Sequence, residues 1–118
     1  MVRHMLLGVD FGTTHTVVAF VDRGNYPVVA FADELGDTHE FFPTLVAATG
    51  QGLVYGFEAA AAGRAGAPVA RSFKRALAAP DAGLDSHLRI GDTRVPLLDV
   101  LTGFFTALRE ALVTDSSV

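Results

Sequence analysis

The stretch GVDFGTT, residues 8–14, decides how this chain of 118 residues is interpreted. It joins an apolar run, residues 5–9, to a second run, residues 15–21, that is rich in β-branched and aromatic side chains. A short polar connection containing glycine between two such runs is typical of a β-hairpin. The pattern therefore predicts an antiparallel hairpin over residues 5–21, with Asp10 at the point where the chain turns.

Outward from the hairpin, the pattern predicts a mixed α/β fold. Residues 27–32 read as a third strand, which gives an antiparallel meander whose apolar arms would be covered on both faces. The later expected elements are a strand 41–48 that pairs back with 53–55, a helix 58–63, helical spacing over 68–77, a hairpin 88–95 and a helix 96–113.

Composition excludes several classes of protein. Half of the residues are hydrophobic and 19% are charged, which argues against disorder, and the net charge of -4 argues against a nucleic-acid binder. There is no cysteine to form a disulfide or a thiolate site. No apolar run reaches the ~18 residues of a membrane span, and residues 1–7 are too short for a secretory signal. We therefore expect a cytoplasmic protein with no membrane partner.

The turn of the hairpin has a chemistry of its own. Gly12 lets the backbone bend and approach a ligand, and Thr13 and Thr14 offer hydroxyls and consecutive N–H groups that suit phosphate oxygens. Asp10 would repel a phosphate unless a cation lay between them, and Mg²⁺ binds through one or two carboxylates plus phosphates. The residues alone are also compatible with a plain glycine turn that ends in an exposed aspartate.

Other candidate sites are weaker. His4, His15, His39 and His87 are scattered without metal-ligand spacing, so we do not expect a zinc site. The acidic loop 33–40 is most simply a solvated surface. Phe41-Phe42 and Phe104-Phe105 are expected to pack in the core.

The segment 8–19, GVDFGTTHTVVA, resembles the first phosphate motif of the seventy-kilodalton heat-shock chaperones, the DnaK-like family of the actin, sugar-kinase and heat-shock ATPase superfamily. The resemblance continues in order along the chain. PTLVA at 43–47, LVYG at 53–56, SFKRAL at 72–77 and the helix after Pro96 are similar to successive segments of that family's first lobe.

The resemblance implies an actin-like ATPase (ribonuclease H-like) fold, of which this chain would be a first-lobe fragment. Residues 1–41 would be the first strands of the phosphate-binding subdomain. Residues 42–118 would be a peripheral subdomain that ends in the helix 96–113.

The resemblance also implies roles for individual residues. Asp10 would hold Mg²⁺ through water, and Gly12, Thr13 and Thr14 would contact the β- and γ-phosphates of ATP or ADP. Lys74, the only lysine in the chain, would lie near the γ-phosphate as the catalytic cation, with Asp10 as its catalytic partner. His15, which stands where the family commonly has tyrosine or asparagine, would lie close to the ligand. Without the resemblance, Lys74 reads as a solvated lysine on a helix.

The function implied is that of an ATP-binding molecular chaperone that hydrolyses Mg-ATP to drive peptide-binding cycles in the stress response. Its partners would be unfolded client peptides, a co-chaperone and a nucleotide exchange factor. The family's second phosphate loop and adenosine loop have no counterpart here, so we expect this polypeptide alone to be inactive: it would neither hydrolyse ATP nor bind it tightly. An open sheet face and strand edge would favour a dimer or swapped assembly.

Two alternatives stay open within the superfamily. A sugar kinase also begins with an aspartate-glycine-threonine hairpin, but it lacks the lysine-arginine helix around Lys74. An actin-like filament or cell-shape protein, or a degenerate interaction domain, would be a non-enzymatic relative. Downstream sequence with a second glycine-rich loop and a peptide-binding β-sandwich would indicate a chaperone.

Overall fold

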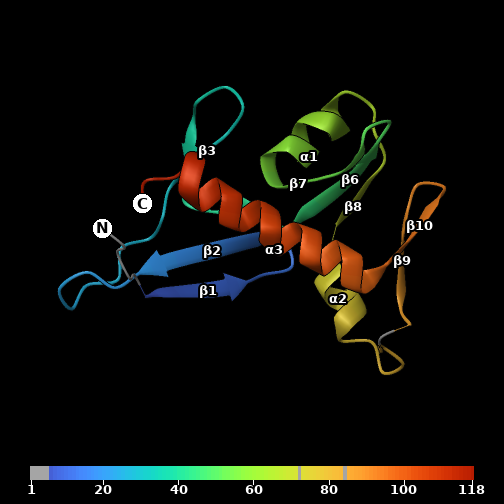
Figure 1. The fold of residues 1–118 in the computed structure, drawn as a ribbon, viewed down its shortest axis with the longest axis horizontal. Coiled ribbons are helices and arrows are strands. Elements are labelled where there is room, and N and C mark those ends of the chain that lie inside the picture. Colours follow the sequence, from blue (N-terminus) through green and yellow to red (C-terminus); the bar gives the residue numbers. More distant parts are fainter. Residues whose placement is uncertain (1–5, 72, 84) are drawn as a thin grey trace.

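The computed structural model describes residues 6–71, 73–83 and 85–118, and over these ranges the chain is a mixed α/β protein. Three helices and several small antiparallel sheets make up the fold (Figure 1). In chain order the elements are β1 (Leu7–Phe11), β2 (His15–Phe20), β3 (Phe31–Ala32), β4 (Thr38–His39), β5 (Phe42–Pro43), β6 (Leu45–Thr49), β7 (Gly52–Tyr55), α1 (Gly56–Arg64), β8 (Val69–Arg71), α2 (Phe73–Leu77), β9 (His87–Ile90), β10 (Thr93–Pro96) and α3 (Leu97–Thr114).

The N-terminal hairpin forms as the sequence predicts. Strands β1 and β2 are antiparallel, with Leu7 opposite Phe20 and Phe11 opposite Thr16. The run of β-branched residues in β2 favours the extended backbone that this pairing requires. The prediction is confirmed for residues 7–20, while Met5 lies outside the described residues.

The predicted three-strand meander is only partly correct. Val28 forms an antiparallel bridge to Ala19 of β2, as a third strand would. On the same edge of β2, His15 and Thr16 pair instead with β5, which gives the sheet order β1-β2-β5. A continuous strand over residues 27–32 is therefore wrong, because the chain leaves β2 and β3 pairs with β4.

A second sheet has β6 at its centre, with β7 on one edge and β8 on the other. The predicted strand 41–48 is split at Thr44 into β5 and β6, and the predicted pairing with residues 53–55 is confirmed as β6–β7. The predicted helix over 68–77 is wrong in its first part, because Val69 pairs with Ala47 in strand β8. The open edge of β6 supplies backbone partners there, and helix α2 begins only at Phe73.

The remaining elements agree with the sequence pattern. Helix α1 spans the predicted alanine-rich segment, β9 and β10 form the predicted hairpin, and α3 begins and ends one residue later than the predicted helix. Pro96 ends β10 and precedes the first turn of α3, where its missing N–H costs no hydrogen bond. None of the helices in the described ranges is long and apolar enough to cross a membrane.

Helix α3 connects the parts of the fold through Phe104. In Figure 1 α3 runs diagonally across the molecule, with the β1–β2 hairpin on one side and α1 with its sheet on the other. The Phe104 side chain is fully buried. Its ring centre lies 5.7 Å from that of Phe11, 5.6 Å from Phe42 and 5.4 Å from Phe73. One residue of α3 therefore contacts β1, β5 and α2, and the hydrophobic core crosses the expected subdomain boundary at residues 41 and 42.

The expectation that the first sheet is covered on both faces is wrong. Val18 of β2 is fully buried, but Leu7 and Val9 of β1 are 41% and 49% exposed. On the opposite face Asp10 and His15 are also exposed. The reason is that β1 is the edge strand of the sheet in the described residues, and the core covers it only at its Phe11 end.

The central position of Phe104 gives a stability prediction. Phe104→Ala should lower the free energy of unfolding by about 3–5 kcal/mol, since it removes a fully buried ring and leaves a cavity. Phe105→Ala is the matched control, because Phe105 is the next residue and is 40% exposed. Urea unfolding curves of both variants measure the difference, and equal losses would show that Phe104 is not the centre of the core.

The exposed edge of β1 gives an association prediction. Unpaired strand edges with apolar side chains favour pairing between copies, so we expect a dimer whose population rises with concentration. Val9→Lys should shift the protein toward monomer, whereas Val21→Lys, at a residue that is also exposed but lies beyond β2, should have a smaller effect. Sedimentation equilibrium tests this, and a monomer over the whole concentration range would contradict it.

Candidate functional site

The tip of the β1–β2 hairpin is closed by a single backbone contact. The N–H of Gly12 donates to the carbonyl oxygen of His15 over 3.1 Å. A Cβ at residue 12 would collide with that same oxygen, so no larger residue fits without moving the turn. The sequence predicts that Gly12 lets the backbone approach a ligand closely. In the structure the close approach is between Gly12 and the carbonyl oxygen of His15, within the hairpin itself.

The turn presents unused hydrogen-bond donors. In the described part of the chain, no recorded hydrogen bond uses the backbone N–H of Thr13 or Thr14. The carbonyl oxygen of Thr14 accepts from the N–H of Thr44 over 3.0 Å, and the buried hydroxyls of Thr16 and Thr44 are hydrogen-bonded at 2.8 Å. The segment after β5 thus holds the turn in place while leaving two consecutive N–H groups available to an anion.

Lys74 lies beside the hairpin. Its Nζ is 5.8 Å from the ring centre of Phe11, and the neighbouring Phe73 is buried at 6.0 Å from the same ring. Because successive side chains of a strand leave opposite faces, Asp10 and Phe11 point to different sides of β1. Lys74 and Asp10 therefore flank the end of β1 from opposite faces.

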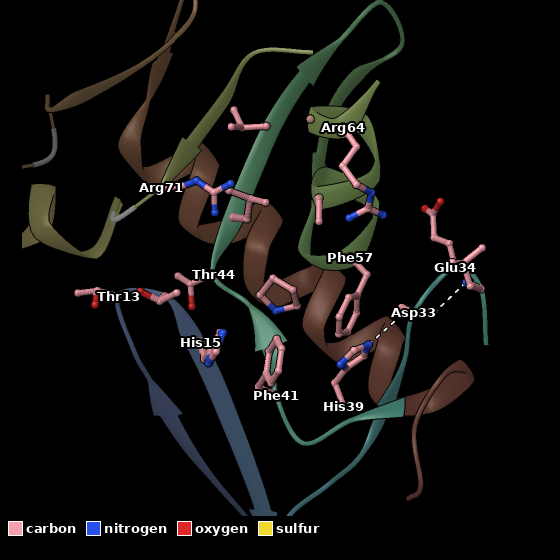
Figure 2. A pocket seen from close by; sticks show the side chains of 17 residues that line it. Thr13, His15, Asp33, Glu34, His39, Phe41, Thr44, Phe57, Arg64 and Arg71 are labelled. Carbon is pink, nitrogen blue, oxygen red and sulfur yellow. Dashed lines mark hydrogen bonds and ion pairs between the residues drawn. The ribbon is translucent and has the colours of Figure 1, made fainter. Parts of the chain in front are cut away.

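A cavity of about 560 Å³ adjoins the tip. Figure 2 shows that its walls come from the hairpin tip, the loop between β3 and β4, β5, α1 and β8. The structure brings Thr13, Thr14 and His15 to this cavity, whereas Asp10, Gly12 and Lys74 do not line it. The lining residues are Thr13, Thr14, His15, Asp33, Glu34, Leu35, His39, Phe41, Pro43, Thr44, Leu45, Phe57, Ala60, Gly63, Arg64, Val69 and Arg71.

Aromatic rings form one wall of the cavity. The rings of His15 and Phe41 are stacked, with centres 3.8 Å apart and an angle of 16° between their planes. His39 lies 5.4 Å from Phe41 and 4.9 Å from Phe57. The assignment of Phe41-Phe42 to the core is right for Phe42 but wrong for Phe41, which is half-buried at the cavity.

The acidic loop contributes a structured corner. Nε2 of His39 and Oδ2 of Asp33 are 2.9 Å apart, and Oδ1 of Asp33 accepts the N–H groups of Leu35 and Asp37. The hydrogen bond to His39 lowers the pKa of Asp33 below its ordinary value, and the two backbone N–H groups add to this while desolvation opposes it. The expectation of a merely solvated acidic surface is therefore wrong for Asp33.

Two arginines that the sequence analysis did not select reach the cavity. Figure 2 shows the guanidinium groups of Arg71, from β8, and Arg64, from the last turn of α1, on two different walls. Within the described residues neither arginine has a carboxylate at ion-pair distance, and the ion pair recorded there joins Asp33 to His39. No local pattern marks these two arginines, because the residues of β8 also fit a helix and the two side chains converge only in three dimensions.

The carboxylate of Asp10 beside the turn is consistent with Mg²⁺ bound together with a phosphate. Among the described residues it is not part of a cage of protein ligands for a metal ion. Over the described ranges no three histidine or carboxylate side chains are grouped so that they could hold a metal. Asp10 offers one exposed carboxylate next to the turn. A single carboxylate suits Mg²⁺, which keeps several waters and takes further ligands from phosphates.

Neither protein-family models nor curated protein sequences give a match to this chain.

The Asp33–His39 pair predicts a pH effect. Because the pKa of Asp33 is lowered in the folded state, its ionised form stabilises the fold above the ordinary aspartate pKa of about 3.9, and this stabilisation is lost as the pH falls below it. His39→Leu should raise the pKa of Asp33, whereas His87→Leu, at an exposed histidine outside the cavity, should not. Carboxyl NMR titration measures this, and an unchanged pKa in His39→Leu would contradict it.

Proposed function

We propose that this chain supplies the first phosphate-binding wall of an ATP-binding domain of the actin and heat-shock ATPase superfamily. The observation that supports it best is the hairpin turn, where two consecutive N–H groups at Thr13 and Thr14 have no recorded partner in the described residues. Such groups bind phosphate oxygens. The exposed carboxylate of Asp10 and the ammonium group of Lys74 flank the end of the same strand.

Each residue has a defined role in this proposal. Thr13 and Thr14 donate to the β- and γ-phosphates, and Gly12 keeps the turn tight enough to present them. Asp10 holds Mg²⁺ through water, and Lys74 offsets the charge of the γ-phosphate as a point charge. His15 is fixed by its stack on Phe41 and lines the ligand side of the turn. Bound Mg²⁺ would supply charge neutralisation between Asp10 and the phosphates.

The whole domain in this proposal has the actin-like ATPase fold and hydrolyses ATP for a heat-shock-type chaperone in the cytoplasm. Client peptides, a co-chaperone and an exchange factor would be its partners. Phosphoryl transfer needs charge stabilisation from several directions, and among the described residues this proposal uses the turn and the two charged groups that flank the end of β1. We therefore propose that these residues bind nucleotide phosphates without hydrolysing ATP by themselves.

The position of Lys74 favours the chaperone over the superfamily's sugar kinases. The lysine-arginine segment belongs to α2, which packs through Phe73 on Phe11 of the hairpin. This contact gives the segment a structural reason to lie next to the phosphate motif. The resemblance assigns that combination to the chaperones.

Calorimetric titration with Mg-ATP tests the proposal. Asp10→Asn and Lys74→Ala should each weaken binding by about tenfold or more, because each removes a charged contact. The matched controls are Asp22→Asn, in the turn after β2, and Arg75→Ala, which is the exposed residue after Lys74. Chelation of Mg²⁺ should reproduce the effect of Asp10→Asn.

Two outcomes would contradict the proposal. One is the absence of any heat with Mg-ATP for a protein whose folding has been checked by circular dichroism. The other is binding that the control substitutions weaken as much as Asp10→Asn and Lys74→Ala do.

A further inference from the structure

We propose that the cavity beside the hairpin binds a planar ring that carries a phosphate group, with the phosphate at the Arg71 end and the ring along the aromatic wall. This site shares the N–H groups of Thr13 and Thr14 with the proposed function. It requires neither Asp10, Lys74 nor Mg²⁺, because Asp10 and Lys74 do not line the cavity.

The charges of the cavity are separated along its length. Figure 2 shows Arg71 above Thr13 and Thr44 at one end, and Asp33 and Glu34 at the other. These two are the carboxylates among the lining residues, and Asp33 is already paired with His39. Among the lining residues, the carboxylates therefore lie away from Arg71, and within the described residues no carboxylate is at ion-pair distance from it.

The Arg71 end has the donors that a phosphate requires. A guanidinium group presents N–H donors in a planar fork that matches the oxygens of a phosphate. The turn adds the two unused backbone N–H groups of Thr13 and Thr14. The hydroxyl of Thr44 is already bonded to that of Thr16, so the threonine beneath Arg71 supports the turn and leaves the phosphate to the other donors.

The middle of the cavity is suited to a ring. Its wall includes the His15–Phe41 stack and Phe57, and Pro43 and Val69 are further apolar residues of the cavity lining. Aromatic faces prefer offset or tilted contact with another ring. A volume of about 560 Å³ exceeds what a phosphate ion fills and falls within the range of small-molecule sites.

The end of the cavity opposite Arg71 offers polar groups that would select which ring binds. Arg64 and Glu34 both line it, and Figure 2 shows them on the same side of the cavity. Together they offer charged donors and an acceptor to polar substituents of a ring. The ligand class is therefore an aromatic phosphate ester with polar ring substituents.

Binding of phenyl phosphate and of inorganic phosphate, in a Mg²⁺-free buffer with EDTA, tests this inference. Phenyl phosphate should bind roughly threefold to tenfold more tightly than inorganic phosphate, because it has a ring that contacts the aromatic wall and inorganic phosphate has none. Arg71→Gln should weaken both ligands by about tenfold or more, and Arg89→Gln, at an exposed arginine of β9, should weaken neither.

Phe57→Leu separates the ring from the phosphate. It should weaken phenyl phosphate binding, because one ring of the wall is lost, and leave inorganic phosphate binding unaffected. Since Phe57 also packs near Phe42, a thermal melt checks the fold. NMR shifts of the His15 and Phe41 rings in the unmodified protein give a second measurement, because phenyl phosphate should move them more than inorganic phosphate does.

Each result decides between the proposals. The inference is overturned if neither ligand binds, if Arg71→Gln has no effect, or if Asp10→Asn or the absence of Mg²⁺ abolishes phenyl phosphate binding. Equal affinities of the two ligands would overturn the ring site. Phenyl phosphate binding without any Mg-ATP binding would support this inference and refute the proposed ATP site alone.

Discussion

The contact between Phe11 and the buried ring of Phe104 is the interaction on which the rest of the structure depends. Phe11 is the last residue of β1, and its ring lies within 6.0 Å of those of Phe73, Phe104 and Phe105. This cluster ties the hairpin to α2 and α3 at the end where its chain turns. Among the described residues the opposite end of β1 has no such support, which is why Leu7 and Val9 remain exposed while the turn end is packed against the core.

A turn that contacts hold in place suits an anion site, because donors that are positioned in advance lose little entropy when a ligand binds. The turn is held from two directions, by Phe11 on the core side and by Thr44, whose N–H binds the Thr14 carbonyl. Neither contact uses the N–H groups of Thr13 and Thr14. The packing that stabilises the fold therefore leaves the donors of the turn available.

The local sequence pattern was sufficient to predict the elements that form between residues close together in the sequence. The hairpin, α1, the β9–β10 turn and α3 follow from alternation, helical spacing and the residues at their ends. The sequence could not show that β8 pairs with β6, since Val69, Phe73 and Leu77 also fit a helix. The cavity could not be predicted for the same reason: Arg64 comes from α1, Phe41 from the bend before β5, and Arg71 reaches the cavity because β8 pairs with β6. The roles of Asp10 and Lys74 stay predictions.

The two proposed ligands meet at one pair of N–H groups, and this has a thermodynamic consequence. Phosphates at the same turn repel each other, and each would need the donors of Thr13 and Thr14. Occupancy of the cavity must then weaken Mg-nucleotide binding, and by linkage the nucleotide must weaken the cavity ligand by the same factor. Arg71 would add positive charge from the cavity. Mg²⁺ would add it at Asp10, on the same face of the hairpin as His15, and Lys74 would add it on the opposite face. The hairpin would thus bind either the nucleotide or the aromatic phosphate, depending on which of these cations contacts the bound phosphate.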